Sequence, residues 1–213
     1  VGEGAFSGCD VLRQIALPDG VREIGYEAFK DCASLEEAVI PQTVLTMGEA
    51  AFEGCVNLVS LTLPFVGKDK NVPTTDEHKL GYLFGHAADN ANVPIALKTL
   101  TVTAAAFLAS EAIRDTRITA LYLNEGIMRI GAYAAYNTAL ENITIPASVL
   151  AIEGHAFENS ALRSVVFASG SKLSTINEAA FKGCASLADI VIPDSVTFIG
   201  SAVFNGCPLS QRF

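Results

Sequence analysis

A short segment recurs along the chain at a nearly fixed spacing, and this recurrence limits what the chain can fold into. Each copy places a Cys three residues after a Phe, and the five cysteines fall at positions 9, 32, 55, 184 and 207. Neighbouring cysteines within each block are 23 residues apart, and the middle of the chain continues the position at 22-residue spacing with Thr116, Thr138 and Ser160. A unit this short cannot bury its own apolar face, so the copies must stack on one another.

A second pattern, Leu-x-x-Ile-x-Ile-Pro, follows each Cys. It begins at Leu12, Leu35, Leu58, Leu140 and Leu187, and it recurs without the proline at Leu97, Ile118 and Leu162. Its alternating apolar residues predict a short strand with one buried and one exposed face. Proline lacks the N–H that a strand needs, so it ends the strand. The chain is therefore expected to form a solenoid of about eight coils with a parallel sheet.

The residues between strand and Phe suggest the shape of each coil. A Val-x-x-Ile-Gly pattern predicts a left-handed residue at the glycine, namely Gly25, Gly48, Gly131 and Gly200. Segments such as Glu27-Ala28-Phe29-Lys30 predict one helical turn with the Phe pointing inward. Ile113 and Ala135 replace the Phe in two coils, and Tyr136 is expected to supply the missing ring in the second.

The complete unit, Leu-x-x-Ile-x-Ile-Pro-x-x-Val-x-x-Ile-Gly-x-x-Ala-Phe-x-x-Cys, resembles the BspA-type leucine-rich repeat, also called the Treponema-type repeat. The resemblance implies an α/β fold, a right-handed horseshoe solenoid. Short parallel strands would line its concave face, and turns and short helical turns its convex face. It covers residues 1–213 as one domain of about eight repeats. It also implies a bacterial secreted or cell-surface protein with an adhesive or protein-binding role, hence an extracellular or cell-surface location.

One repeat departs from the pattern through two insertions, at roughly 65–79 and 85–96. The first insertion is polar. The two insertions leave from opposite ends of neighbouring strands, so they are expected to project at opposite rims. The following stretch, Thr103–Ser110, fits the repeat poorly and is predicted to be a short helix. Asp76, Glu77, His78, His86 and Asp89 gather in the insertions, but their spacing matches no metal motif, and solvated loops are expected. His155 is expected to be exposed on an outer turn.

Composition excludes several classes of function. The net charge of -9 argues against nucleic-acid binding and against docking on anionic lipid. The longest apolar run, Ala104–Ala109, is far shorter than the roughly 20 residues of a membrane helix. Five cysteines cannot all pair within one chain, and stacked thiols do not converge on a metal, so a buried ladder is expected. No nucleophile elbow or phosphate-binding glycine loop occurs, and neither enzymatic activity nor a cofactor is predicted.

The exposed side of the predicted sheet is the remaining candidate site. Its central row is apolar and Thr-rich, it is flanked by mixed charge, and Tyr122 stands at its centre. The candidate binding residues are Arg13, Glu36, Val39, Thr62, Lys98, Thr101, Tyr122, Thr144, Arg163 and Val166.

Two functions remain open at this stage. One is a non-enzymatic binding module for a protein, such as a host extracellular-matrix protein, or for a glycan. The other is a structural spacer that holds another domain away from the cell surface. Because the sequence starts and stops inside a repeat, end-to-end self-association through uncapped coils is also expected.

Overall fold

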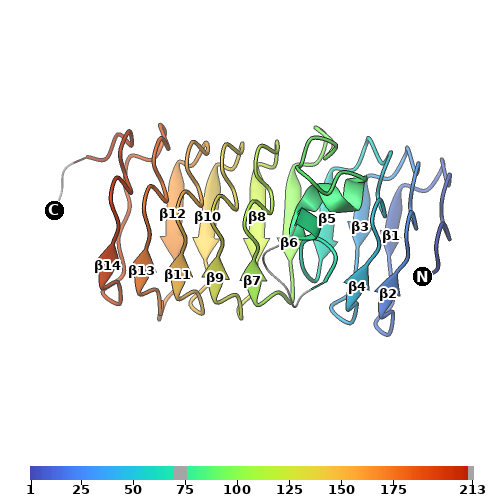
Figure 1. Cartoon of the computed structure of the whole chain (residues 1–213), viewed down its shortest axis with the longest axis horizontal. Coiled ribbons are helices and arrows are strands. Elements are labelled where there is room, and N and C mark those ends of the chain that lie inside the picture. The colour runs from blue at the N-terminus through green and yellow to red at the C-terminus, as the bar shows by residue number, and fades with distance from the viewer. Residues whose placement is uncertain (70–75, 211–213) are drawn as a thin grey trace.

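The computed structural model describes residues 1–69 and 76–210 and shows parallel strands stacked along one long axis (Figure 1). One sheet has the order β1-β3-β5-β6-β8-β10-β12. Its strands are β1 (Gln14–Ala16), β3 (Glu37–Val39), β5 (Ser60–Leu63), β6 (Thr99–Val102), β8 (Ala120–Leu123), β10 (Asn142–Ile145) and β12 (Ser164–Phe167). Seven coils each contribute one strand in the same direction, which confirms the predicted parallel-strand solenoid, but the eighth copy of the pattern, residues 187–193, forms no strand.

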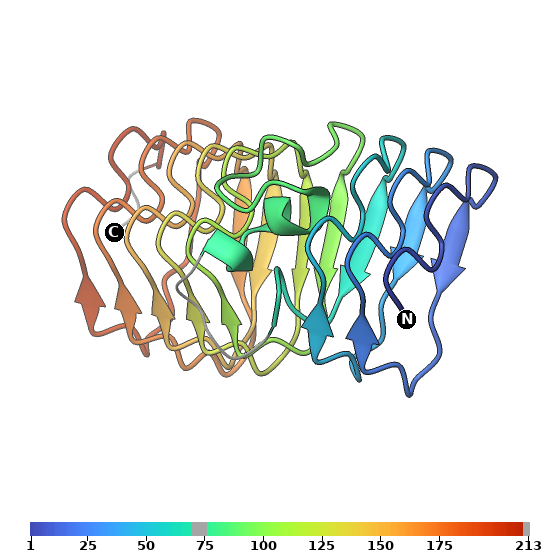
Figure 2. The ribbon, with the colours of Figure 1, turned by 45° about the vertical axis from the view of Figure 1, so that its right-hand side comes forward.

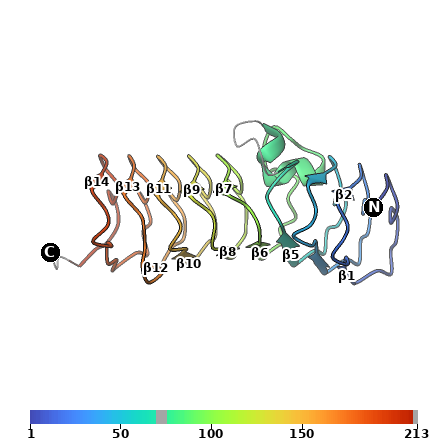
Figure 3. The same cartoon turned by 90° about the horizontal axis from the view of Figure 1, so that it is seen from below.

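Shorter strands follow the opposite side of the coils (Figure 2). Five of them form a sheet: β7 (Phe107–Leu108), β9 (Arg129–Ile130), β11 (Ala151–Ile152), β13 (Thr175–Ile176) and β14 (Phe198–Ile199). Two more, β2 (Glu23–Ile24) and β4 (Thr46–Met47), pair separately. Figure 3 shows the segment with the 3₁₀ helices η1 (Asp76–His78) and η2 (Leu80–Phe84) between these two groups.

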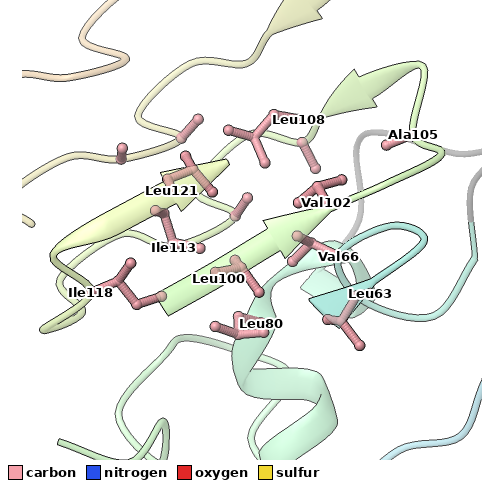
Figure 4. Close-up of a cluster of buried hydrophobic side chains, with 14 of the residues drawn as sticks. Leu63, Val66, Leu80, Leu100, Val102, Ala105, Leu108, Ile113, Ile118 and Leu121 are labelled. Atoms are coloured by element: carbon pink, nitrogen blue, oxygen red, sulfur yellow. The ribbon is translucent and has the colours of Figure 1, made fainter. Parts of the chain in front are cut away.

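The core lies between the sheets and is built from rows of identical positions. Leu100 in β6 pairs in register with Leu61 in β5 and Leu121 in β8, and all three side chains are buried. Figure 4 shows this region, where Leu108 and Ile113 approach from the other sides of the coil. Burying one leucine stabilises a fold by about 1.5–3 kcal/mol, so each row joins successive coils through apolar contact.

A third edge of the coils carries the phenylalanine row. The ring of Phe29 stacks nearly parallel between Phe6 and Phe52, with centroids 5.1 and 5.2 Å away. The same stacking joins Phe157, Phe181 and Phe204. The backbone N–H of Phe29 also donates to the carbonyl of Ala51 in the next coil at 2.8 Å. The inward orientation predicted for these rings is confirmed, and this edge is hydrogen-bonded from coil to coil.

The helical turn predicted around each Phe is wrong. Glu27 and Asp31 bracket Phe29 with φ of 52° and 57°. Left-handed residues at both ends reverse the backbone curvature, so no consecutive run of helical residues forms. Equivalent left-handed residues include Glu111, Asp115, Tyr133, Asn137, His155 and Asn159.

The helix predicted over Thr103–Ser110 is also wrong. This segment contains strand β7, in which Leu108 pairs with Ile130 of the next coil. The neighbouring coil supplies backbone partners at each position, and that pairing overrides the helix propensity of the alanines. Within the described residues the helices are η1 and η2 alone, so the molecule is a β-solenoid with almost no helix rather than an α/β protein.

The glycines that follow the Val-x-x-Ile pattern serve a different purpose from the one predicted. Gly25, Gly48, Gly131 and Gly200 all lack a positive φ. A Cβ on Gly131 would lie 2.5 Å from the Ser110 N atom and 2.7 Å from the Ala109 carbonyl carbon of the preceding coil. Real Cβ atoms do not approach backbone so closely, so glycine is needed here because two coils pass in near contact.

The cysteine row bridges coils through weak hydrogen bonds. The Cys55 thiol donates to the carbonyl of Phe29 in the preceding coil, with 3.1 Å between Sγ and O. Cys32, Cys184 and Cys207 do the same to Phe6, Phe157 and Phe181. The threonines at this position bond within their own coil instead, as when Thr116 donates to Ile113 at 2.8 Å, whereas the Ser160 hydroxyl lies 3.3 Å from the Cys184 thiol of the next coil. All five cysteines are free thiols.

Replacing Gly131 by alanine should destabilise the fold by about 2 kcal/mol or more, because the new methyl group would force two coils apart. Gly154 is the matched control, since its φ is not positive and its nearest contact, the Glu178 carbonyl, would be 3.4 Å from the new Cβ. Gly154→Ala should change stability by less than about 1 kcal/mol. Urea unfolding of both variants measures this, and equal losses would contradict the close-approach explanation.

Burial raises the pKa of the Cys55 thiol to about 12 and also raises that of Cys32. Because the thiolate is the reactive form, the buried thiols of the folded chain should react slowly with Ellman's reagent at pH 8. Unfolding in guanidinium should release all five for rapid reaction. Rapid titration of all five thiols in the folded chain would show that the ladder is accessible.

Candidate binding surface

The outer face of the seven-stranded sheet carries the predicted binding row in register. Thr101 of β6 pairs with Thr62 of β5 and Tyr122 of β8, and Thr144 of β10 pairs with Val166 of β12. The row continues to Val39 and Ala16 at the other end of the sheet. Tyr122 is 59% exposed and its neighbour Leu121 only 3%, so the predicted alternation of buried and exposed positions is confirmed.

The row becomes more apolar and more hollowed toward the C-terminal half of the sheet. A hollow of about 290 Å³ lies beside Tyr122 and Thr144 and is bounded by Val166. A second hollow, of about 560 Å³, continues from Val166 to Val191. Val166 is 52% exposed and Val191 84% exposed. Exposed apolar side chains beside shallow hollows form a surface into which a partner's side chains can pack.

The predicted charged residues all lie one position before their strands. They differ in whether the side chain is already paired within the chain or can contact a partner. Arg13 forms an exposed ion pair with Glu36 at 2.7 Å, and such pairs contribute at most about 1 kcal/mol. The Lys98 Nζ atom donates to the Ile95 carbonyl at 2.6 Å, so this side chain fastens the end of the second insertion. The Arg163 backbone N–H donates to the Glu141 carbonyl at 2.7 Å, but its side chain is exposed and makes no hydrogen bond or ion pair with the described residues. Arg163 is therefore the cation of this edge that is free to meet a partner.

The two insertions pack together instead of projecting at opposite rims. Residues 70–75 of the first lie outside the described residues. The buried Lys79 at its end donates to the Ala88 carbonyl of the second insertion at 2.6 Å and to Asp76 at 2.8 Å. The Gly81 N–H donates to the Asn90 side chain at 2.8 Å. These contacts carry no signal in the spacing of the sequence, so the prediction failed.

The insertion carboxylates and imidazoles form separate pairs. Lys79 binds Asp76, Lys68 binds Glu77 at 3.0 Å, and His86 lies 2.8 Å from Asp89. His78 was predicted to be solvated, but it is buried. Within residues 1–69 and 76–210, no group of three or more His, Cys, Asp or Glu side chains is placed to hold a metal. Over the same residues, no helix is long and apolar enough to cross a membrane.

An aromatic cluster covers the turn edge where the phenylalanine row is interrupted. The rings of Tyr133 and His155 stack with centroids 4.6 Å apart, and the Arg114 guanidinium lies 5.0 Å from the centroid of Tyr136. Tyr136 is thus part of a surface cluster and does not fill the missing Phe position. His155 is half-buried against Tyr133 and not exposed as predicted, because its ring also lies 2.5 Å from Glu158.

Glu158 anchors one side of this cluster. Burial alone would raise the pKa of its carboxyl group, but hydrogen bonds from His155 and Lys182 outweigh burial and lower the pKa. The Lys182 Nζ atom lies 3.0 Å from a Glu158 oxygen. The carboxylate is therefore ionised at neutral pH, and it joins its own coil to the next one through Lys182.

Comparison with known proteins identifies the repeat. The family model described as the BspA type leucine-rich repeat region matches residues 1–72 and 106–212, in six copies. The chain belongs to the BspA-type leucine-rich repeat family. The stretch between the two matched ranges is the coil that carries the insertions, so the family pattern is interrupted where the structure also departs from regularity.

Solved structures of similar fold come from bacterial repeat proteins. A leucine-rich cell surface protein from Faecalibacterium prausnitzii A2-165 is 22% identical over 98% of this BspA-type chain and 62% of its own, with a TM-score of 0.47. A leucine-rich repeat protein from Bacteroides ovatus is 20% identical over 97% and 79%, with a TM-score of 0.34. The pneumococcal vaccine antigen PcpA is 18% identical over 97% and 41%, with a TM-score of 0.43. The chain thus spans less than two thirds of the first of these proteins, and no curated protein sequence matches it.

The opposite orientations of Tyr122 and Leu121 predict different effects on stability. Tyr122→Ser should change the free energy of unfolding by less than about 0.5 kcal/mol, because the ring is largely in solvent. Leu121→Ala should cost about 2–5 kcal/mol, because it leaves a cavity between coils. Urea denaturation of the two variants tests this, and a large loss for Tyr122→Ser would mean that the ring supports the fold.

Proposed function

We propose that this BspA-type segment is a non-enzymatic protein-binding module, with its partner along the C-terminal half of the seven-stranded sheet. The observation that carries the proposal is the row Tyr122, Thr144 and Val166, whose large members are exposed beside two hollows. Tyrosine and arginine are the residue types that most often dominate binding energy at interfaces, and Arg163 lies unpaired at the edge of this row.

A rigid sheet face with shallow hollows suits a protein partner. Strands β8 and β10 are paired on both sides and β12 is paired with β10, so the exposed row loses little conformational freedom on binding. Hydroxyl groups of Thr144 and Ser164 stand between the large side chains and can hydrogen-bond a partner without burying charge. A host extracellular-matrix protein is the partner class that we put forward.

The location that fits this role is the cell surface or the extracellular space. The Faecalibacterium prausnitzii protein is a cell surface protein. We extend that location to this chain on its family membership and not on the structural likeness.

A structural spacer is the second candidate. The observation that favours it is the continuous pairing of the seven-stranded sheet, which stiffens the described solenoid along its length. In that case the exposed row would bind nothing, and the function would reside in other parts of a longer protein.

The double variant Tyr122→Ser/Arg163→Ala should weaken binding by about 30-fold or more, the effect of losing an interface hot spot. The measurement is biolayer interferometry of the chain against a panel of purified host extracellular-matrix proteins. Tyr26→Ser/Arg22→Ala is the matched control, since both residues are exposed and lie outside this sheet. Equal loss in the two double variants would contradict the proposed face, and no binding to any panel member would favour the spacer.

A further inference from the structure

A second candidate site lies where the second insertion meets the next regular coil. Figures 2 and 3 show the inserted segment standing out from the otherwise even stack. A cavity of about 460 Å³ opens at this step, between residues 89–95 and residues 111–117. Its size falls in the range of pockets that hold small organic ligands, roughly 300–1,000 Å³. Tyr122 and Val166 are not among its lining residues, so it is separate from the binding row on the sheet.

The floor of this pocket is held rigidly. Asn90 is buried, and its side-chain nitrogen donates to the carbonyls of Glu111 and Arg114 at 3.1 and 3.0 Å. Lys79 is also buried, and its ammonium group lies 3.3 Å from the Glu111 carboxylate. These bonds tie the insertion to the coil, so the pocket exists before any ligand enters and its groups need little reordering.

The polar groups that remain available are of both signs. Arg117 is exposed, and its guanidinium makes no hydrogen bond or ion pair with the described residues. The two carboxylate oxygens of Asp115 each accept one hydrogen bond, from Asn137 at 2.7 Å and from Arg114 at 3.1 Å. Each oxygen can accept another. Asp89 is exposed on the opposite wall; its Oδ1 atom lies 2.8 Å from the His86 Nδ1 atom and accepts from the Ala91 N–H at 2.7 Å, and its other oxygen can accept from a ligand. Three cations and three carboxylates line the pocket: Lys79, Arg114, Arg117, Asp89, Glu111 and Asp115. The lining is therefore neutral overall, which favours neither an anion nor a cation.

Apolar and aromatic surfaces adjoin these polar groups. Ile95 is 76% exposed and lines the pocket together with Val93. On the far side, Arg114 forms a wall and also lies against the rings of Tyr133 and Tyr136, 5.6 and 5.0 Å from their centroids. A ligand longer than the pocket would therefore continue over an aromatic ledge.

We infer that this pocket binds a neutral saccharide. Vicinal hydroxyl groups both donate and accept, so one sugar ring can donate to Asp89 or Asp115 while it accepts from Arg117. The C–H face of the ring is apolar and matches Ile95, and a second sugar unit can stack on Tyr136. The three cations and three carboxylates of the lining balance, so it carries no net positive charge that would select a sialylated or sulfated sugar.

The test is a binding assay of the purified chain against neutral oligosaccharides, by saturation-transfer difference NMR and then by titration. The probes are gluco-, galacto-, manno- and N-acetylglucosamine oligosaccharides, with sialyllactose and a sulfated disaccharide as acidic comparisons. Arg117→Gln should weaken binding of a neutral probe about tenfold or more, because it removes a charged donor that contacts no other side chain. Arg22→Gln, at an exposed arginine outside the pocket, should leave binding unchanged.

The outcomes separate this site from the sheet. Binding of a neutral oligosaccharide that Arg117→Gln weakens and Tyr122→Ser does not would support the pocket, whatever the sheet binds. Loss of that binding through Tyr122→Ser, with Arg117→Gln unchanged, would overturn it. Preferential binding of the acidic probes would overturn the neutral class, and no binding of any probe at millimolar concentration would overturn the site.

Discussion

Successive coils of this solenoid approach one another to backbone hydrogen-bonding distance on all three edges, and the rest of the structure depends on that contact. Strand spacing of about 4.8 Å leaves no room for a side chain between passing backbones. Gly131 meets this limit by having no Cβ. The ring of Phe29 meets it by stacking flat on its neighbours, and the thiol of Cys55 by reaching back to a carbonyl. Gly, Phe and Cys recur in the repeat because each of them meets this spacing requirement.

Even stacking also determines where function can lie. When every coil repeats the same contacts, its outward side chains fall into straight rows that the fold does not use. Tyr122 and Val166 stand in such a row and contribute little to packing. A break in the stacking has the opposite effect, because the insertion creates a step and the step creates a pocket beside Arg117. The regular part of the molecule thus supplies a sheet face with shallow hollows, and the irregular part supplies a separate pocket.

The sequence was sufficient to predict the strands of the seven-stranded sheet, the parallel stacking and the inward Phe row, because each depends on local alternation repeated many times. It did not predict the short strands on the opposite side of the coils, because two residues are too few to show an alternation. The prediction of a left-handed Gly131 was wrong, since the sequence does not distinguish a glycine that permits close approach of two coils from one with a positive φ. The sequence misled over Thr103–Ser110 because pairing with the next coil outweighs local propensity. The pocket near Arg117 could not be predicted, since it depends on how Asn90 and Lys79 tie distant segments together. The length of the insertion was the one signal that pointed there.

The most direct test of the binding face is site-specific photocrosslinking. A benzophenone amino acid would replace Tyr122 in one preparation and Tyr26 in another, since both tyrosines are exposed but lie on different faces. Each preparation would be irradiated with a matrix protein that the chain binds. We expect a covalent adduct from position 122 and none from position 26. An adduct from position 26 alone would contradict the assignment of function to the seven-stranded sheet.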